Sequence, residues 1–218
     1  MARGGAGRTK IPHWLHPLVV AAAFIPLAWV AWAMWSDVFQ GTRLLGSEPI
    51  KESEHFTGKW ALRFLLTCLA VTPAIRVTKL GSLIKYRRTF GLIAFSYACV
   101  HLTIYFGLDI ELMWSNLAED VLDRLYITLG MTALTLLIPL AVTSTKGWVK
   151  RLGSRRWNAL HRLVYVSAVL GVAHFYLAQK RDVREPLIFA AILAALFVSR
   201  LVHARRTTAR TSPSAAAT

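Results

Sequence analysis

Two histidines lie inside apolar stretches of the sequence, where an ionisable side chain is costly and therefore marks a candidate functional site. His101 lies twelve residues after Thr89, the start of an uncharged run, which places it about 18 Å along a helix; His174 lies about 22 Å along a helix that begins near Ala159. Two neutral imidazoles that face each other at one depth suit a haem iron, which accepts axial nitrogen ligands on opposite faces of the ring. Separate hydrogen bonds from each histidine to neighbouring helices are the alternative explanation.

A third histidine, His161, precedes His174 by thirteen residues, or about 20 Å, and the two do not share one face of an ideal helix. Arg87 and Arg88 lie fourteen and thirteen residues before His101, where a second ligand would be expected. Arginine stays protonated and is a poor iron ligand, but it suits an anionic propionate or phosphate. The region around His161 therefore holds either a weakly ligated second haem or a flavin or quinone site. Otherwise His161 is an interfacial histidine with basic neighbours.

Membrane-spanning helices must position these side chains. The 218 residues are 55% hydrophobic and only 17% charged, whereas a soluble domain carries roughly 25% charged residues. Six apolar runs approach the roughly 17 to 25 residues that cross a bilayer. They cover residues 17–35, 60–75, 89–108, 125–143, 163–178 and 186–199. We therefore predict an all-α integral membrane protein, a bundle of six transmembrane helices with no soluble domain.

The formal net charge of +15 is distributed in a way that predicts topology. Four segments at alternate ends of the runs hold basic residues and no acidic residue: Arg3, Arg8 and Lys10; Arg76, Lys79, Lys85, Arg87 and Arg88; Lys146, Lys150, Arg151, Arg155, Arg156 and Arg162; and Arg200, Arg205, Arg206 and Arg210. All eleven Asp and Glu residues lie in the other three connections. Because Lys and Arg are retained on the cytoplasmic side, both termini are expected to be cytoplasmic. The basic charge then indicates contact with membrane lipid, and no nucleic acid partner is expected.

These boundaries divide the chain into three parts. Residues 1–16 form a basic cytoplasmic arm, residues 17–203 the transmembrane domain, and residues 204–218 a basic cytoplasmic tail that we expect to be disordered. A long side chain at Arg200 is expected to reach from the last span to the membrane surface.

Several motifs of soluble chemistry are absent from the sequence. It contains no G-x-G-x-x-G fingerprint, P-loop or H-E-x-x-H motif, and no C-x-x-C-H sequence that would attach a haem covalently. Any haem is therefore expected to be non-covalent, and any donor or acceptor of electrons must be another molecule.

Four stretches together resemble a known family. They are HFTGKWALRFLLTCLAVTPAIR, RRTFGLIAFSYACVHLTIYFGLD, YITLGMTALTLLIPLAVTSTKGW and LGSRRWNALHRLVYVSAVLGVAHFYL, and they cover most of residues 55–190. The chain resembles the haem-binding membrane subunits of the bacterial periplasmic protein-methionine-sulfoxide reductase system, a branch of the ferric-reductase-like transmembrane superfamily that includes the NADPH oxidases. One departure is Leu125, where the family pattern has proline.

The resemblance implies an electron-transfer subunit of the bacterial inner membrane, with no catalytic residue of its own. It implies one or two haems b, with the family's ligand histidines at His101, His161 and His174, and it adds FMN as a further cofactor. Electrons would come from the quinone pool or from a cytoplasmic flavin reductase. They would pass to a periplasmic molybdopterin-containing methionine-sulfoxide reductase, which repairs oxidised periplasmic proteins.

Three alternatives stay open, one of which is an interaction scaffold for another enzyme with no cofactor of its own. A transmembrane ferric or other metal reductase would use the same electron path with a different acceptor. A transporter of another class would use the histidines as a proton relay; Pro26, Pro73 and Pro139 interrupt three spans, but no internal repeat is visible in the sequence. The acidic connection from Asp109 to Asp123 is a candidate docking surface for an acceptor protein.

Overall fold

The computed structural model describes residues 12, 14–179 and 182–211, with side chains described to Arg206, and the regular elements among them are all helical. The α-helices are α1 (Leu15–Gln40), α2 (Pro49–Thr78), α3 (Ile84–Ile104), α4 (Trp114–Asp123), α5 (Leu125–Val142), α6 (Lys146–Leu160), α7 (Leu163–Ala178) and α8 (Arg184–Thr211). A short 3-10 turn, η1 (Gly81–Leu83), precedes α3, and a π-helical turn, η2 (Tyr105–Asp109), follows it. The all-helical prediction is confirmed for this part of the chain.

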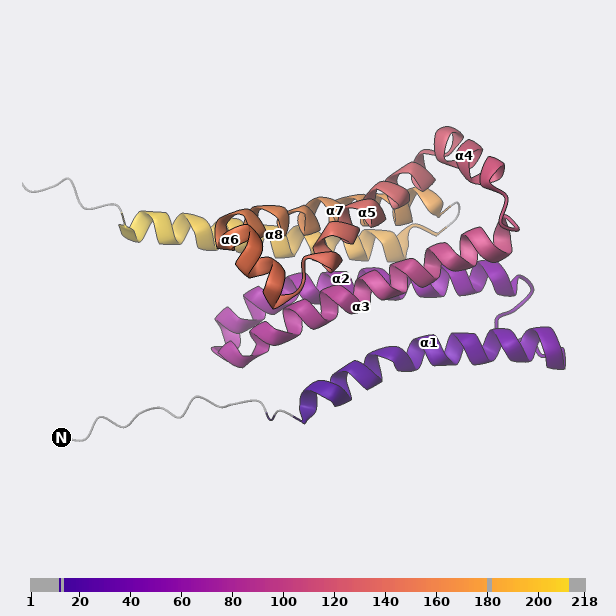
Figure 1. Ribbon diagram of the computed structural model, residues 1–218, viewed down its shortest axis with the longest axis horizontal. Helices are drawn as coiled ribbons and strands as arrows, with labels where there is room; N and C mark the ends of the chain where they lie inside the picture. The colour runs from indigo at the N-terminus through magenta and orange to yellow at the C-terminus, as the bar shows by residue number, and fades with distance from the viewer. Residues whose placement is uncertain (1–11, 13, 180–181, 212–218) are drawn as a thin grey trace, which may run out of the picture.

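The long helices run back and forth along one axis (Figure 1). The pairs α2–α3 and α5–α7 have the most extensive contacts, while α1 and α8 pack on the outside of these two hairpins. We call the end where α1 begins and α8 finishes the basic end, since it carries η1, α6 and the Lys and Arg residues of positions 76–88 and 146–162. The opposite end, which carries α4 and all eleven carboxylates, is the acidic end.

Among the described helices, five are long and apolar enough to cross a membrane: α1, α2, α3 with its flanking turns, α5 and α8. The remaining predicted span, residues 163–178, is α7, which meets α6 at an angle of 41° and qualifies as a span only when the two helices are taken together. Exposed side chains on the long helices are largely apolar, among them Trp29, Ile188 and Leu201. The chain is thus a multi-pass membrane protein with five spans, or six if the bent pair crosses as one.

Local sequence signals explain where the helices begin and end. Pro49 occupies the first turn of α2, where its missing N–H costs no hydrogen bond, and Gly41 closes α1 with φ 67°. Gly153 inside α6 has φ 72° and ψ 152°, a conformation that interrupts the helix and that L side chains avoid. Asp37 stabilises the turn after α1, because its carboxylate accepts bonds from the backbone N–H groups of Leu44 and Leu45, both at 2.8 Å.

Several boundaries differ from the sequence expectations. α2 begins at Pro49, eleven residues before the apolar run at Trp60, because its polar first turns pack at the acidic end. α7 begins at Leu163 and not near Ala159, so it has only 16 residues. α8 continues to Thr211, which makes residues 204–211 of the expected tail helical; Ala and Arg favour helices. Residues 1–11 and 212–218 of the expected arm and tail lie outside the described residues.

Tyr97 of α3 is the largest side chain among the fully buried ones described. Its hydroxyl donates a 2.7 Å hydrogen bond to the carbonyl oxygen of Ala23 on α1. Its ring packs against Phe64 of α2 and Phe24 of α1, with centroids 5.3 and 6.3 Å away. This residue therefore attaches α1 to the α2–α3 hairpin through both a polar and an aromatic contact.

We predict that Tyr97→Phe lowers the free energy of unfolding by on the order of 0.6 to 1.7 kcal/mol, the range for interhelical hydrogen bonds in membranes. Reversible unfolding in mixed micelles measures the change. Trp60→Phe is the matched control, because the indole N–H of Trp60 is buried without a described partner and its loss removes no bond. Equal stability of Tyr97→Phe and the wild type would contradict the assigned role.

Candidate functional site

His101 and His174 lie side by side near the acidic end of the bundle. His101 is one turn from the end of α3 and His174 one turn from the end of α7. Their ring centroids are 6.1 Å apart and the ring planes cross at 75°. The two helices that carry them run in the same direction (Figure 1), so the rings meet at one depth in the bundle.

Each of the two rings is held by a backbone carbonyl of the neighbouring helix. The Nδ1 atom of His101 lies 3.0 Å from the carbonyl oxygen of Glu54 on α2, and that of His174 lies 2.6 Å from the carbonyl oxygen of Tyr126 on α5. A carbonyl oxygen can only accept, so Nδ1 must carry the proton in both rings. Nε2 is then the unprotonated nitrogen that can bind a metal.

The arrangement is repeated in the two hairpins. In each, a helix that starts at the acidic end supplies a carbonyl near its first turns, and the helix that returns to that end supplies the histidine. The sequence separations are 47 residues for Glu54 and His101 and 48 for Tyr126 and His174. The hairpins α2–α3 and α5–α7 are therefore an internal structural repeat, which the sequence did not reveal.

These residues fit a haem. The two histidines present neutral imidazoles with a free Nε2, and two metal–nitrogen bonds of about 2 Å each agree with rings whose centres are some 6 Å apart. Groups of three or more His, Cys, Asp or Glu side chains that could hold a metal ion do not occur among the described residues. The pair thus suits an iron whose remaining ligands are supplied by a porphyrin.

His161 lies at the basic end, in the break between α6 and α7, and not within a membrane-spanning helix. Its ring stacks on Trp157 with centroids 3.8 Å apart, and its Nε2 lies 3.1 Å from the hydroxyl oxygen of Thr143. That hydroxyl donates to the carbonyl oxygen of Pro139 at 2.6 Å, so His161 must donate from Nε2. Nδ1 is then the nitrogen left for a metal, in contrast to the other two histidines.

The two predicted arginines have different surroundings. Arg87 of α3 is half-buried and lies close enough to His161 and to the Cys68 thiol to interact electrostatically with both. Arg88, the next residue, is exposed. The structure therefore brings Arg87 to the level of His161 and leaves Arg88 on the surface of the basic end.

Arg200 of α8 is a polar residue of this level that the sequence reasoning missed. We expected it to extend toward the membrane surface, but its guanidinium turns inward and donates to the carbonyl oxygen of Leu69 on α2 at 2.6 Å. It also donates to the hydroxyl of Tyr165 on α7, and its Nε is buried without a described partner. Inward rotation is favoured because the Leu69 carbonyl and the Tyr165 hydroxyl accept hydrogen bonds from two of the three guanidinium nitrogens. A single arginine at the end of an apolar run does not distinguish the two orientations.

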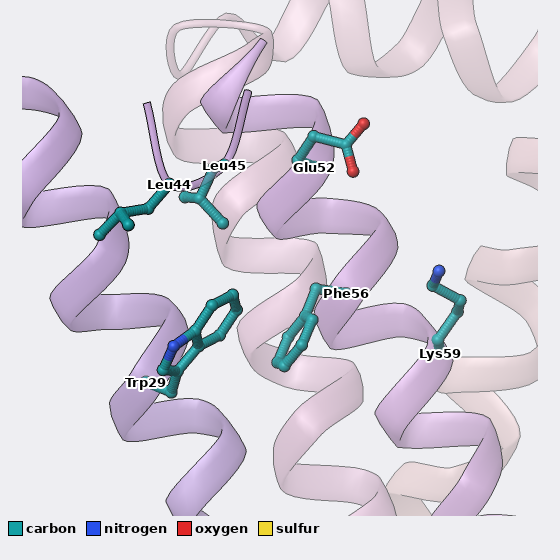
Figure 2. Close-up of a pocket in the computed structure, with 6 residues that line it drawn as sticks. All are labelled: Trp29, Leu44, Leu45, Glu52, Phe56 and Lys59. Atoms are coloured by element: carbon teal, nitrogen blue, oxygen red, sulfur yellow. The ribbon is translucent and has the colours of Figure 1, made fainter. Parts of the chain in front are cut away.

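The acidic end carries two shallow hollows. One of about 160 Å³ lies between α1 and α2 and is lined by Trp29, Leu44, Leu45, Glu52, Phe56 and Lys59 (Figure 2). The other, of about 320 Å³, is lined by Asp109, Ile110, Asn116, Glu119, Asp120 and Arg124 around α4. None of the three candidate histidines lines either hollow. The second, however, belongs to the acidic connection that we considered as a docking surface.

Comparisons with known proteins agree with this architecture. Residues 57–172 match the family described as ferric reductase like transmembrane component. A protein-methionine-sulfoxide reductase heme-binding subunit MsrQ of Caulobacter vibrioides is 47% identical over 199 residues, which cover 91% of this chain and 92% of that protein. Proteins of the same name from Xanthomonas campestris pv. campestris and Xanthomonas euvesicatoria pv. vesicatoria are 48% identical over 197 and 198 residues, in both cases 89% of this chain and 90% of the relative.

We predict that Arg200→Leu lowers the free energy of unfolding in mixed micelles by about 1.5 to 3 kcal/mol, because it removes charged hydrogen bonds that join α8 to α2 and α7. Arg200→Lys keeps the charge and can still donate one of the hydrogen bonds, so its decrease in the free energy of unfolding is expected to be smaller. Arg63→Leu is the control, since Arg63 is exposed and lies over the ring of Trp60. A loss no larger for Arg200→Leu than for Arg63→Leu would show that these contacts do not join the helices.

Proposed function

Because the chain belongs to the ferric-reductase-like transmembrane family and, within it, to the MsrQ family, we propose that it is a haem b electron-transfer subunit of a methionine-sulfoxide reductase system. The observation that carries this proposal is the pair of imidazoles, 6.1 Å apart, each with its Nδ1 held by a helix carbonyl. Bound haem would supply a one-electron ferric/ferrous couple at this point of the membrane.

In this proposal His101 and His174 would hold the haem iron at the acidic end. Their Nδ1–H bonds to carbonyl oxygens orient the rings and make Nε2 a better electron donor to iron. The helices pack closely around the pair: Tyr97, one turn before His101, and Phe175, next to His174, are both buried. The protein thus presents two neutral ligands in a low-dielectric site. Neither histidine has to lose a proton before its Nε2 can bind iron.

A second cofactor level is proposed at the basic end, around His161. Arg87 and Arg200 give this level positive charge, which suits a propionate, a phosphate or a reduced quinone oxygen. The cofactor there would be a second haem held through Nδ1 of His161, or FMN with its phosphate toward Arg87 and the exposed Arg88. The engaged Nε2 of His161 supports weaker iron ligation here than at the acidic end.

The charge asymmetry supports the proposed orientation of the protein in the membrane. With Lys and Arg retained in the cytoplasm, the basic end is the cytoplasmic face of a bacterial inner membrane and both termini lie on that side. Electrons would enter there from the quinone pool or from a cytoplasmic flavin reductase. They would leave at the acidic end to a periplasmic molybdopterin-containing reductase that repairs methionine sulfoxide in proteins.

A chain of contacts connects the acidic-end site with the surface. The ring of Tyr126 is 6.0 Å from that of His174, and its hydroxyl interacts with Arg124. Arg124 in turn forms a 2.9 Å ion pair with Asp120, which also accepts a bond from Tyr105. Arg124 and Asp120 line the hollow around α4. This hollow therefore lies over a set of side-chain contacts that leads from His174 to the surface, which supports docking of the acceptor there.

We predict that the purified protein shows haem b absorption bands, and that His101→Ala and His174→Ala each abolish the bis-histidine spectrum. An optical redox titration combined with haem and flavin quantification measures this and counts the cofactors. His161→Ala is expected to leave the spectrum of the acidic-end haem in place. His203→Ala, an exposed histidine of α8, is the control. Retention of the spectrum in both His101→Ala and His174→Ala, or absence of haem from the wild type, would refute the proposed function.

A separate prediction concerns the acceptor. The double variant Asp109→Asn, Glu119→Gln removes two carboxylates from the hollow around α4 and is expected to slow reoxidation by the periplasmic reductase about tenfold at low ionic strength, and less at high salt. Stopped-flow absorbance of the haem measures the rate. Glu52→Gln in the other hollow is the matched control, because it removes an exposed carboxylate at the same end. An unchanged rate in the double variant would exclude this docking surface.

A further inference from the structure

Two glycines lie directly against the two facing histidines. A Cβ atom added to Gly58 of α2 would be 3.3 Å from both Nδ1 and Cε1 of His101. A Cβ atom added to Gly130 of α5 would be 2.8 Å from Nδ1 and 3.0 Å from Cε1 of His174. Contacts of 3.0 to 3.4 Å are tighter than most real Cβ contacts, and those under 3.0 Å essentially never occur. The rings occupy the space that any other residue would fill.

The two glycines have the same relation to the carbonyls that hold the rings. Gly58 is four residues after Glu54, and Gly130 is four residues after Tyr126. Residues four apart lie on one face of a helix, one turn from each other. In both hairpins, therefore, a carbonyl that accepts the Nδ1–H is followed one turn later by a glycine that lets the ring approach the helix backbone.

Other described helical glycines do not have this relation to a histidine. A Cβ at Gly171 of α7 would meet the end of the Leu62 side chain at 3.1 Å, and one at Gly91 of α3 would meet the Cys68 sulfur at 3.5 Å. Those two positions allow ordinary close packing of helices. Glycine inside a helix is destabilising relative to alanine, because it loses more backbone freedom on folding. At Gly58 and Gly130 that cost is offset by the placement of an imidazole.

We infer that Gly58 and Gly130 are positioning residues for the haem ligands, an inference that rests on the proposed function. Each glycine keeps its ring against the helix, so that the Nδ1–H meets the carbonyl and Nε2 is directed away from it. The pair of glycines also determines the 75° angle between the ring planes. Orientation and ligand basicity both act on a bound metal, so these positions would influence the electronic properties of the haem through its ligands.

The test compares Gly130→Ala and Gly58→Ala with the wild-type protein in detergent. In Gly130→Ala the new methyl group displaces His174 from the Tyr126 carbonyl, so haem transfer to apomyoglobin is expected to become about tenfold faster or more, the usual effect of losing an outer-sphere partner. The midpoint potential is expected to rise, because a less basic ligand stabilises ferric iron less. The low-spin electron paramagnetic resonance signal, which depends on the angle between the ligand planes, is expected to shift or convert to a high-spin signal. Gly58→Ala should change each property in the same direction by a smaller amount.

Gly171→Ala and Gly91→Ala are the matched controls. Both add one methyl group to a helix that carries a ligand histidine, but neither methyl group contacts a ring. They are expected to keep the wild-type potential, resonance signal and rate of haem loss, even where they lower thermal stability. If Gly130→Ala does not accumulate in the membrane, the milder contact at Gly58 makes Gly58→Ala the deciding variant.

The outcomes separate this inference from the proposed function. Wild-type potential and resonance signals in the Gly58→Ala and Gly130→Ala proteins, or equal shifts in Gly171→Ala, would overturn the positioning role. The bis-histidine spectrum would then still depend on His101 and His174, and the proposed function would stand. A wild-type protein without haem would refute the proposed function itself.

Discussion

The bilayer interior has no water, so each polar group of a spanning helix needs a partner within the protein. An imidazole in this environment must be neutral, and one of its nitrogens must carry a proton that some acceptor receives. The carbonyl oxygens of Glu54 and Tyr126 are those acceptors, although they already belong to helices. Each carbonyl thus accepts from a helix N–H and from the imidazole Nδ1–H, which leaves Nε2 as the free nitrogen. This contact is possible only where no side chain lies between the helix backbone and the ring. The close α2–α3 and α5–α7 pairs meet that requirement.

The same constraint explains how the levels at the two ends differ. At the acidic end both rings have their Nδ1 bonded, and the two hairpins present them symmetrically. At the basic end His161 donates from Nε2 to Thr143, stacks on Trp157, and has cationic neighbours. The first environment favours two strong neutral ligands for one metal. The second favours an anionic ligand and a single, less available nitrogen. The cofactors proposed for the two ends would therefore differ in affinity and in potential.

Much of the fold could be predicted from the sequence, because hydrocarbon length and charge segregation act on whole segments. The apolar runs became helices, and the depth of His101 and His174 placed them at one level. Features that depend on single residues could not be predicted from the sequence in this way. Gly153 interrupts α6 through its φ of 72°. The presence of a glycine in a basic segment does not by itself predict that conformation. The inward turn of Arg200 depends on the Leu69 carbonyl, which is 131 residues away in the chain. The repeat of carbonyl, glycine and histidine was not recognised in the sequence, because the two hairpins share only one glycine and one histidine at nearly the same spacing, and any residue can supply the carbonyl.

The break between α6 and α7 has a consequence for the membrane around the protein. α7 has 16 residues, a length of about 24 Å, whereas the hydrocarbon layer is about 30 Å thick. Such hydrophobic mismatch is relieved by thinning of the bilayer next to the short helix or by drawing polar flanking residues into it. On this side of the bundle, lipid headgroups and water therefore come closer to His161 than they do beside the longer α2. The short α7 thus reduces the thickness of the hydrocarbon layer on the side of the bundle where His161 and His174 lie.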